Sequence, residues 1–168
     1  MQRSSFGDQP CSVARTLDII GDRWTPLVLR DIAVGVSRFD AIQRDLGLSR
    51  KVLTQRLETL LEHEVVVRVA YSEHPPRYDY RLTEKGNDLA MVLLAMQQFG
   101  DKWTFGGGGP LKWRHLSCGE VSTPVACCDH CGEQVRPGEA IPIKGPDFVD
   151  GAFPEVGAAL ERIETLLG

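Results

Sequence analysis

Two amphipathic helices separated by a glycine turn constrain the fold of this chain more than any other feature. Apolar residues at helical spacing predict a first helix that ends at Gly47, because glycine readily adopts the left-handed conformation that closes a helix. Ser49 is then suited to cap a second helix. The apolar residues of the two helices are Phe39, Ile42, Leu46, Val52, Leu53, Leu57, Leu60 and Leu61. The pattern predicts a helix-turn-helix.

A strand pair follows these helices. Residues 65–70 are rich in β-branched side chains and predict a strand, and residues 78–82 alternate as its antiparallel partner would. The segment between them contains Pro75 and Pro76, which would stiffen a tight turn. We therefore expect an α+β fold, a mainly α-helical winged helix-turn-helix with a two-stranded wing.

Helices are also predicted on both sides of this motif. Residues 11–35 favour two short helices, because Gly21 and Asp22 interrupt the apolar pattern and Pro26 suits the first turn of the second helix. Thr83 is suited to cap a long helix whose apolar surface is wider than packing on one core requires. We expect a second chain to cover the excess apolar surface.

A run of glycines, Gly106–Gly109 before Pro110, divides the chain. Four glycines do not sustain a helix, so we expect a flexible joint there. The predicted division is a winged-helix DNA-binding and dimerisation domain over residues 1–104, a linker over 105–110, and a small zinc-ribbon-like extension over 111–168. Residues 154–167 predict a short amphipathic helix at the end of that extension.

The net charge of −4 at first argues against nucleic-acid binding, but it is unevenly distributed. Positive and negative residues balance over residues 1–104, and residues 105–168 carry the whole excess of acid. Residues 37–56 have a local net charge of +3, which can serve phosphate contacts. No apolar run approaches membrane-spanning length and the N-terminus lacks a signal-peptide pattern, so we expect a cytoplasmic protein with no membrane partner and reduced thiols.

The predicted second helix carries a polar and basic outer face, which suits the major groove of duplex DNA. Arg50 and Lys51 suit guanine edges or phosphates, and Gln55 suits adenine. Ser49 could hold a phosphate at the helix N-terminus, and Thr54 could contact a thymine methyl. The candidate DNA-binding residues are Arg38, Ser49, Arg50, Lys51, Thr54, Gln55, Arg56, Arg77 and Tyr78, with Arg56 expected at a phosphate and Arg77 in the minor groove. A solvated helix face beside an ordinary hairpin is the structural alternative.

Six short motifs follow one another between residues 10 and 86. They are Pro10–Val13, Gly21–Trp24, Arg38–Phe39, Leu48–Thr54, Pro75–Tyr80 and Leu82–Gly86. In their order and spacing the chain resembles the HxlR family of bacterial winged-helix regulators, which are relatives of the MarR type. The resemblance implies a homodimer formed by the first and last helices of residues 10–103, with a recognition helix starting near Ser49. It also implies a wing near His74–Tyr78.

The chain departs from the family pattern in two places. The helix before the first wing strand usually ends in glycine, whereas here the position is Glu64, and a glutamate in a left-handed cap is strained. The segment after Gly109 is absent from many members and resembles the extension of a longer subgroup. The geometry at Glu64 is therefore in question.

Cys11 lies at or near the start of the first predicted helix, where the helix dipole favours a thiolate. The family resemblance extends to this residue, and several HxlR-type proteins use a cysteine there to sense oxidants or electrophiles. A thiol switch at Cys11 and a partly buried cysteine without a switching role both remain open.

The other cysteines lie in the extension. His115, Cys118, Cys128 and Cys131 form an HxxC and a CxxC pair, and glycine follows Cys118 and Cys131 as in zinc knuckles. The four would complete a structural zinc site, with Cys127 and His130 as spare donors. The alternatives are a disulfide from Cys118 to Cys128 or Cys131, and a degenerate ribbon that holds neither.

Three functional classes compete. The first is a homodimeric transcriptional regulator, expected to repress, whose trigger is either oxidation of Cys11 or a small-molecule effector. The second is an enzyme or redox carrier built on the cysteines, which we do not favour because no group is placed to assist a nucleophile. The four-glycine run also lacks the Lys-Ser/Thr of a phosphate loop. The third is a protein-interaction module on a winged-helix scaffold.

Overall fold

The computed structural model describes residues 5–167 and divides the chain into two compact units. One unit is Val13–Pro110, and the other combines Met1–Ser12 with Leu111–Gly168. No helix in the described part of the chain is both long and apolar enough to cross a bilayer.

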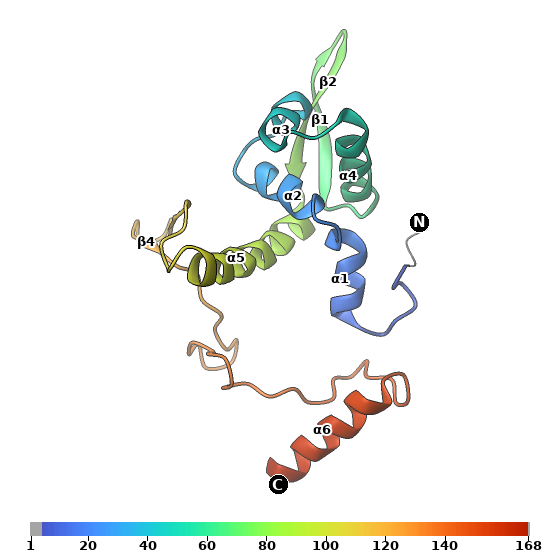
Figure 1. Ribbon diagram of the computed structural model, residues 1–168, viewed down its shortest axis with the longest axis vertical. Coiled ribbons are helices and arrows are strands. Elements are labelled where there is room, and N and C mark those ends of the chain that lie inside the picture. The colour runs from blue at the N-terminus through green and yellow to red at the C-terminus, as the bar shows by residue number, and fades with distance from the viewer. Residues whose placement is uncertain (1–4, 168) are drawn as a thin grey trace. The chain divides into compact units, whose positions relative to one another are not determined.

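The first unit is a winged helix-turn-helix, as expected from the sequence. The helices α2, α3 and α4 gather at the base of the β1–β2 hairpin, whose far end extends away from them as the wing (Figure 1). The elements are α1 (Ser12–Ile20), α2 (Thr25–Ala33), α3 (Phe39–Leu46), α4 (Arg50–Glu62), β1 (Val66–Glu73), β2 (Pro76–Leu82) and α5 (Glu84–Thr104).

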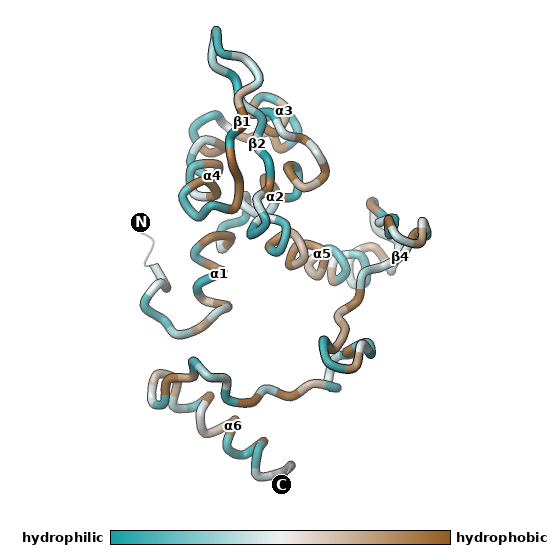
Figure 2. Tube along the Cα trace, turned by 180° about the vertical axis from the view of Figure 1, so that it is seen from behind, coloured by the Kyte–Doolittle hydropathy of each residue, from teal (hydrophilic) through white to brown (hydrophobic). Residues whose placement is uncertain are grey.

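The core of this unit lies among α2, α3, α4 and the start of β1. Figure 2 shows brown and teal residues alternating along α4, as its amphipathic sequence requires. The buried core residues are Val28, Leu29, Ile32, Ile42, Leu48, Leu53, Leu57, Leu60, Val65 and Val66. Truncating one such leucine to alanine typically costs about 2–5 kcal/mol, so Leu53, Leu57 and Leu60 anchor α4 on this core.

The turn between α3 and α4 has the predicted geometry. Gly47 is left-handed, with φ of 62°, and Leu48 tucks into the core with 7% of its surface exposed. The Ser49 hydroxyl accepts a hydrogen bond from the Val52 amide at 3.3 Å and so caps α4. The Gln43 side-chain amide donates to the Leu48 carbonyl at 3.1 Å, which secures the turn from α3.

The two wing strands pair antiparallel, with Val66 opposite Leu82 and Glu73 opposite Pro76. The register shifts between Ala70 and Ser72, and this bulge twists the outer part of the hairpin. Both strands extend further towards the turn than predicted. Pro75 and Pro76 lie at the end of the hairpin, so they do not interrupt the pairing of the strands.

Glu64 occupies the left-handed position in question, with φ of 55°. The backbone keeps the geometry that glycine would provide, because three hydrogen bonds hold it there. The Glu64 amide donates to Leu61 O at 3.0 Å, and the Val65 amide donates to Leu60 O at 2.8 Å. The Thr83 hydroxyl donates to Glu64 O at 2.7 Å and also accepts from the Gly86 amide, so it caps α5 as predicted.

The second unit has little regular structure. It contains the short antiparallel pair β3 (Trp113–Arg114) and β4 (Val121–Ser122), and it ends in α6 (Pro154–Leu167), close to the predicted helix. Lys144 contacts Asp150 at 3.2 Å and Glu161 of α6 at 3.3 Å, and these two hydrogen bonds raise the Lys144 pKa.

Candidate nucleic-acid interface

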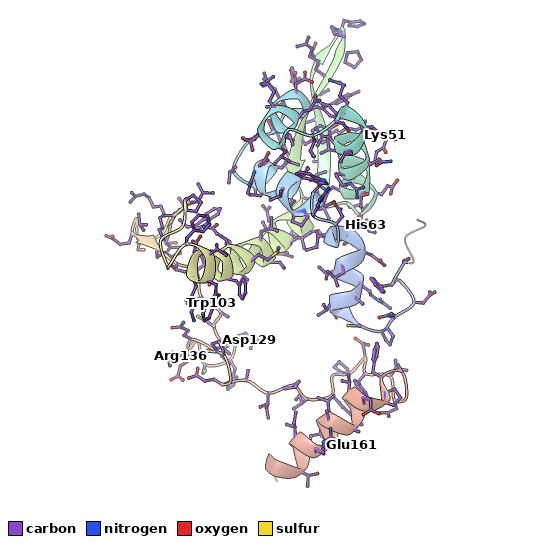
Figure 3. All side chains as sticks on the ribbon, in the orientation of Figure 1. Lys51, His63, Trp103, Asp129, Arg136 and Glu161 are labelled. Atoms are coloured by element: carbon purple, nitrogen blue, oxygen red, sulfur yellow. The ribbon has the colours of Figure 1, made fainter. Side chains whose placement is uncertain are left out.

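The N-terminal half of α4 presents a polar face outside the core. Arg50, Lys51, Thr54 and Gln55 are all exposed, whereas Leu53 on the opposite face is fully buried. These four positions recur as i, i+1, i+4 and i+5, and so share one side of the helix. Figure 3 shows Lys51 on the outer side of α4, away from the hairpin. The predicted recognition residues therefore lie together.

Arg50 is held in place by neighbours on α3. Its guanidinium lies over the Phe39 ring at 4.7 Å and bonds to Asp40 at 3.1 Å. The Arg50 and Asp40 side chains are 70% and 71% exposed, and such surface pairs contribute little stability. A phosphate can replace Asp40 at small cost, while Phe39 keeps the guanidinium extended.

Arg38 joins α3 to the base of the wing. Its guanidinium lies over the Tyr71 ring at 4.4 Å and contacts Asp79 at 3.4 Å. Asp79 also accepts a hydrogen bond from the Ser37 hydroxyl at 3.1 Å. The side chain of Arg38 remains 61% exposed, so it is available to an anion beside the wing.

Arg56 has a different environment from the other candidate residues. Its side chain is only 20% exposed, and Nη1 bonds to Asp22 Oδ2 at 3.0 Å. Asp22 also accepts the amides of Trp24 at 2.8 Å and Thr25 at 3.1 Å, together with the Thr25 hydroxyl. Arg56 thus connects α4 to the start of α2, and its role at a phosphate stays a prediction.

The electrostatics of Asp22 reflect these contacts. Burial alone raises its pKa, but the Thr25 hydroxyl, the two amides and the charge of Arg56 outweigh burial and lower the pKa below its ordinary value. Asp31 shows the opposite balance. Burial raises its pKa more than the hydrogen bond from Arg30 lowers it, and its Oδ2 is buried without a hydrogen-bond partner.

The wing carries exposed Arg77 and Tyr78, the two residues predicted there. The sequence interpretation missed Arg68, whose guanidinium lies over the Tyr78 ring at 5.3 Å across the hairpin. It also missed Tyr71, which supports Arg38. The alternation of β1 puts Arg68 on one face of the hairpin, but nothing local in the sequence shows that it pairs with Tyr78.

Apolar side chains are exposed along α1 and α5. On α5, Val92, Met96, Phe99 and Trp103 recur at helical spacing and are 41–66% exposed. Figure 3 shows Trp103 projecting from α5. On α1, Val13 is 69% and Leu17 is 45% exposed. A monomer would leave these side chains in water, where apolar surface is unfavourable.

The cysteines fall into separate places. Cys11 is half-buried and directly precedes α1. In the second unit His115 Nδ1 lies 3.3 Å from Cys118 Sγ, and Cys128 interacts with Cys131. Within residues 5–167 no three His, Cys, Asp or Glu side chains gather as a metal site, and none of the five cysteines forms a disulfide. The HxxC and CxxC pairs are therefore formed, but not brought together.

A model of the HxlR-like helix-turn-helix family matches residues 19–106, which include the recognition helix and the wing. The chain belongs to this family. A helix-turn-helix transcriptional regulator of Mycobacterium tuberculosis (Rv3095), itself uncharacterised, is 43% identical to this HxlR-family chain over 138 residues. That alignment covers 82% of this chain and 87% of the relative.

Solved structures agree with this assignment. The crystal structure of PA1607, described as a transcription factor, is 31% identical with a TM-score of 0.71 and covers 84% of this chain and 100% of that chain. The reduced redox regulator HypR is 29% identical with a TM-score of 0.51 and covers 58% of this chain and 99% of its own. This member of the HxlR family is a transcriptional regulator with a DNA-binding helix-turn-helix, and not an enzyme.

Proposed function

We propose that the protein is a homodimeric, sequence-specific repressor in the cytoplasm that places α4 in the major groove of duplex DNA. The observation that carries this proposal is the exposed face of Arg50, Lys51, Thr54 and Gln55 on a helix held by a rigid core. The Ser49-capped N-terminus of α4 adds partial positive charge where a phosphate would bind.

The wing supplies a second contact in this proposal. Arg77 and Tyr78 lie exposed at the far end of the hairpin, and Arg68 supports Tyr78 from the opposite strand. Arginine is favoured in narrow minor grooves, where the negative potential is strongest. Arg38, at the start of α3 beside the base of the wing, would contact a phosphate next to the wing.

The dimer would form through the exposed apolar residues of α1 and α5. Two copies of α4 must then match two half-sites about one turn of DNA apart. A dimer bound over a promoter excludes polymerase, which is why we propose repression. A change at the dimer interface would alter the separation of the two recognition helices.

The proposed trigger is oxidation of Cys11, which precedes the interfacial helix α1. The similarity to the redox regulator HypR supports a thiol trigger. A thiol oxidant such as diamide takes two electrons and two protons from two thiols and joins their sulfurs in a disulfide. Oxidation of Cys11 to a disulfide would therefore need a second thiol in the dimer. The alternative trigger is a small-molecule effector bound at the interface.

Selection of bound sequences from random duplex DNA tests the proposal, first with wild type and then with the Arg50→Ala, Lys51→Ala, Arg77→Ala triple variant. Wild type should enrich a palindromic site. The triple variant should lose at least about tenfold in affinity for that site while remaining dimeric. Lys85→Ala, an exposed charge at the start of α5, is the matched control and should bind as wild type does.

The same experiment distinguishes the competing class. If wild type enriches nothing, or the triple variant binds the selected site undiminished, the interface proposed here is wrong. A protein-interaction module on a winged-helix scaffold then becomes the better interpretation. In vitro transcription from the selected site tests repression, since an activator would raise the transcript level.

A further inference from the structure

The two metal-donor pairs of the second unit lie in turns of the same design. The first turn is His115–Glu120 and the second is Cys128–Glu133. Each begins with a metal-ligating residue type, has cysteine at its fourth position, and continues with glycine and glutamate. The repeated pattern is the first indication that the two segments serve one purpose.

The backbone hydrogen bonds of the two turns match one for one. The Gly119 amide donates to His115 O at 2.8 Å, and the Gly132 amide donates to Cys128 O at 2.8 Å. The His115 amide donates to Glu120 O at 2.9 Å, and the Cys128 amide donates to Glu133 O at 2.8 Å.

Both glycines are left-handed, with φ of 77° at Gly119 and 75° at Gly132, a conformation that other residues rarely adopt. Each turn therefore brings its first and fourth residues, which are the two metal donors, to the same end of the turn. The reversal of the chain after each cysteine depends on the glycine that follows it.

The side chains within each turn are already spaced as metal ligands. His115 Nδ1 and Cys118 Sγ are 3.3 Å apart. Tetrahedral zinc, with bonds of about 2.1 Å to nitrogen and 2.3 Å to sulfur, separates two such ligands by about 3.5 Å. In the second turn the backbone amides of His130 and Cys131 donate to the Cys128 sulfur, as amides do in zinc knuckles.

The part of the extension that carries the two turns lacks an apolar core. Within residues 111–145 no described side chain is buried, and Leu116 is 92% exposed. A segment without an apolar core needs a disulfide or a metal to hold it in one conformation. The cysteines form no disulfide here.

We propose that a zinc ion binds His115, Cys118, Cys128 and Cys131 of one chain and holds the two turns together as a structural site. Each turn is formed by its own backbone hydrogen bonds, and the ion would join the two turns, since metal binding and folding are coupled in small sites. Residues 119–127 can span up to about 30 Å, so the connection is long enough. Four protein ligands leave no open position, which makes the site structural.

Cys127 provides the matched control. It precedes the second turn, pairs in a bridge with Gln134, and lies 4.0 Å from the Val125 carbonyl. It therefore stands outside the repeated pattern although it neighbours a proposed ligand. Cys127→Ser should leave the zinc content unchanged, and Cys131→Ser should abolish it.

The test is the metal content of full-length, untagged protein purified under reducing conditions, measured by mass spectrometry with plasma ionisation. Wild type and Cys127→Ser should hold about one zinc per chain and Cys131→Ser about none. His115→Cys should keep the ion, because cysteine can replace histidine as a ligand. Cobalt(II) in place of zinc should give the intense visible bands of a tetrahedral thiolate site, and Cys118→Ser should weaken them.

Several results would overturn the assignment. These are wild type without stoichiometric zinc, equal loss of zinc in Cys127→Ser, and about half an ion per chain, which would indicate a site shared between copies. A mapped disulfide from Cys118 to Cys128 or Cys131 in metal-free protein would also overturn it. Metal content is measured in the absence of DNA, so failure of the zinc proposal is distinguishable from failure of the proposed DNA-binding function.

Discussion

Arg56 Nη1 lies 3.0 Å from Asp22 Oδ2, and this ion pair ties the recognition helix α4 to the loop that opens α2. The two side chains are 20% and 12% exposed, so the contact is largely shielded from water. Asp22 is itself fixed by the amides of Trp24 and Thr25. The carboxylate that contacts the recognition helix therefore also accepts the amide of Thr25, the first residue of α2.

Replacing Arg56 separates a positioning role from a phosphate contact. Arg56→Ala should lower the free energy of unfolding by about 2 kcal/mol, because it leaves Asp22 without its charged partner in a shielded place. Urea denaturation measures this loss. If Arg56 only contacted a phosphate, Arg56→Ala would leave the free energy of unfolding unchanged. It would instead reduce the salt dependence of DNA binding by about one charge.

The Asp22 ion pair also predicts how stability responds to acid. The folded-state pKa of Asp22 is below its ordinary value near 3.9. Its contribution is therefore present above about pH 4 and lost as the pH falls through the lower folded value. The stability difference between wild type and Asp22→Asn should be largest near neutral pH and shrink towards pH 3, in urea denaturation at a series of pH values.

Asp31 provides a control of opposite sign. Its folded-state pKa is raised by burial, so its contribution is present at low pH and is lost as the pH rises through the folded value. Asp31→Asn should accordingly gain stability relative to wild type as the pH rises. If both variants respond to acid in the same direction, the assignment of the two carboxylates is wrong.

Glu64 stores strain that glycine would relieve. With φ of 55° it holds a conformation that costs a side-chain-bearing residue about 1 kcal/mol, so Glu64→Gly should raise the free energy of unfolding by about that amount. Glu58→Gly, an exposed position inside α4, should lower it by a similar amount because helical glycine is unfavourable. Thermal and urea unfolding of the two variants should thus diverge from wild type in opposite directions.

Much of the winged helix could be predicted from the sequence because its signals are local. Gly47, Ser49 and Thr83 each act within a few residues, and the structure confirms the turn and both caps. The role of Arg56 could not be predicted, because Asp22 lies 34 residues away in the chain. The sequence predicted a phosphate contact for Arg56, but only packing shows which carboxylate it meets.

In the wing and the extension, too, contacts between residues far apart in the chain could not be predicted. Arg38 contacts Tyr71 and Asp79 only because the hairpin folds back on α3, a long-range pairing that local patterns do not encode. In the extension the spacing of His115 and Cys118 indicated a metal-donor pair, and the structure brings that pair together. Spacing within one turn says nothing about the distance between two turns.

Self-association through α5 gives a prediction that does not depend on DNA. Phe99 is 66% exposed in the middle of the apolar face. Phe99→Glu should shift the protein to monomer, because burying an unpaired carboxylate in an apolar interface costs several kcal/mol. Analytical ultracentrifugation gives the masses. Val34→Glu, at an apolar position that is 49% exposed after α2, should leave the dimer intact. A wild-type monomer at micromolar concentration would refute the interface.

Cys11 gives the last prediction, which concerns the trigger. If Cys11 is the sensor, diamide should change the affinity of wild type for its selected site by about tenfold, in the range of ordinary allosteric coupling. Cys11→Ser should bind that site equally with and without diamide, because it cannot form the disulfide. Cys127→Ser should respond as wild type does, since its thiol lies in the extension. Fluorescence anisotropy with labelled duplex measures all three. A persistent response in Cys11→Ser would move the sensor to the extension cysteines, and no response in wild type would favour a small-molecule effector.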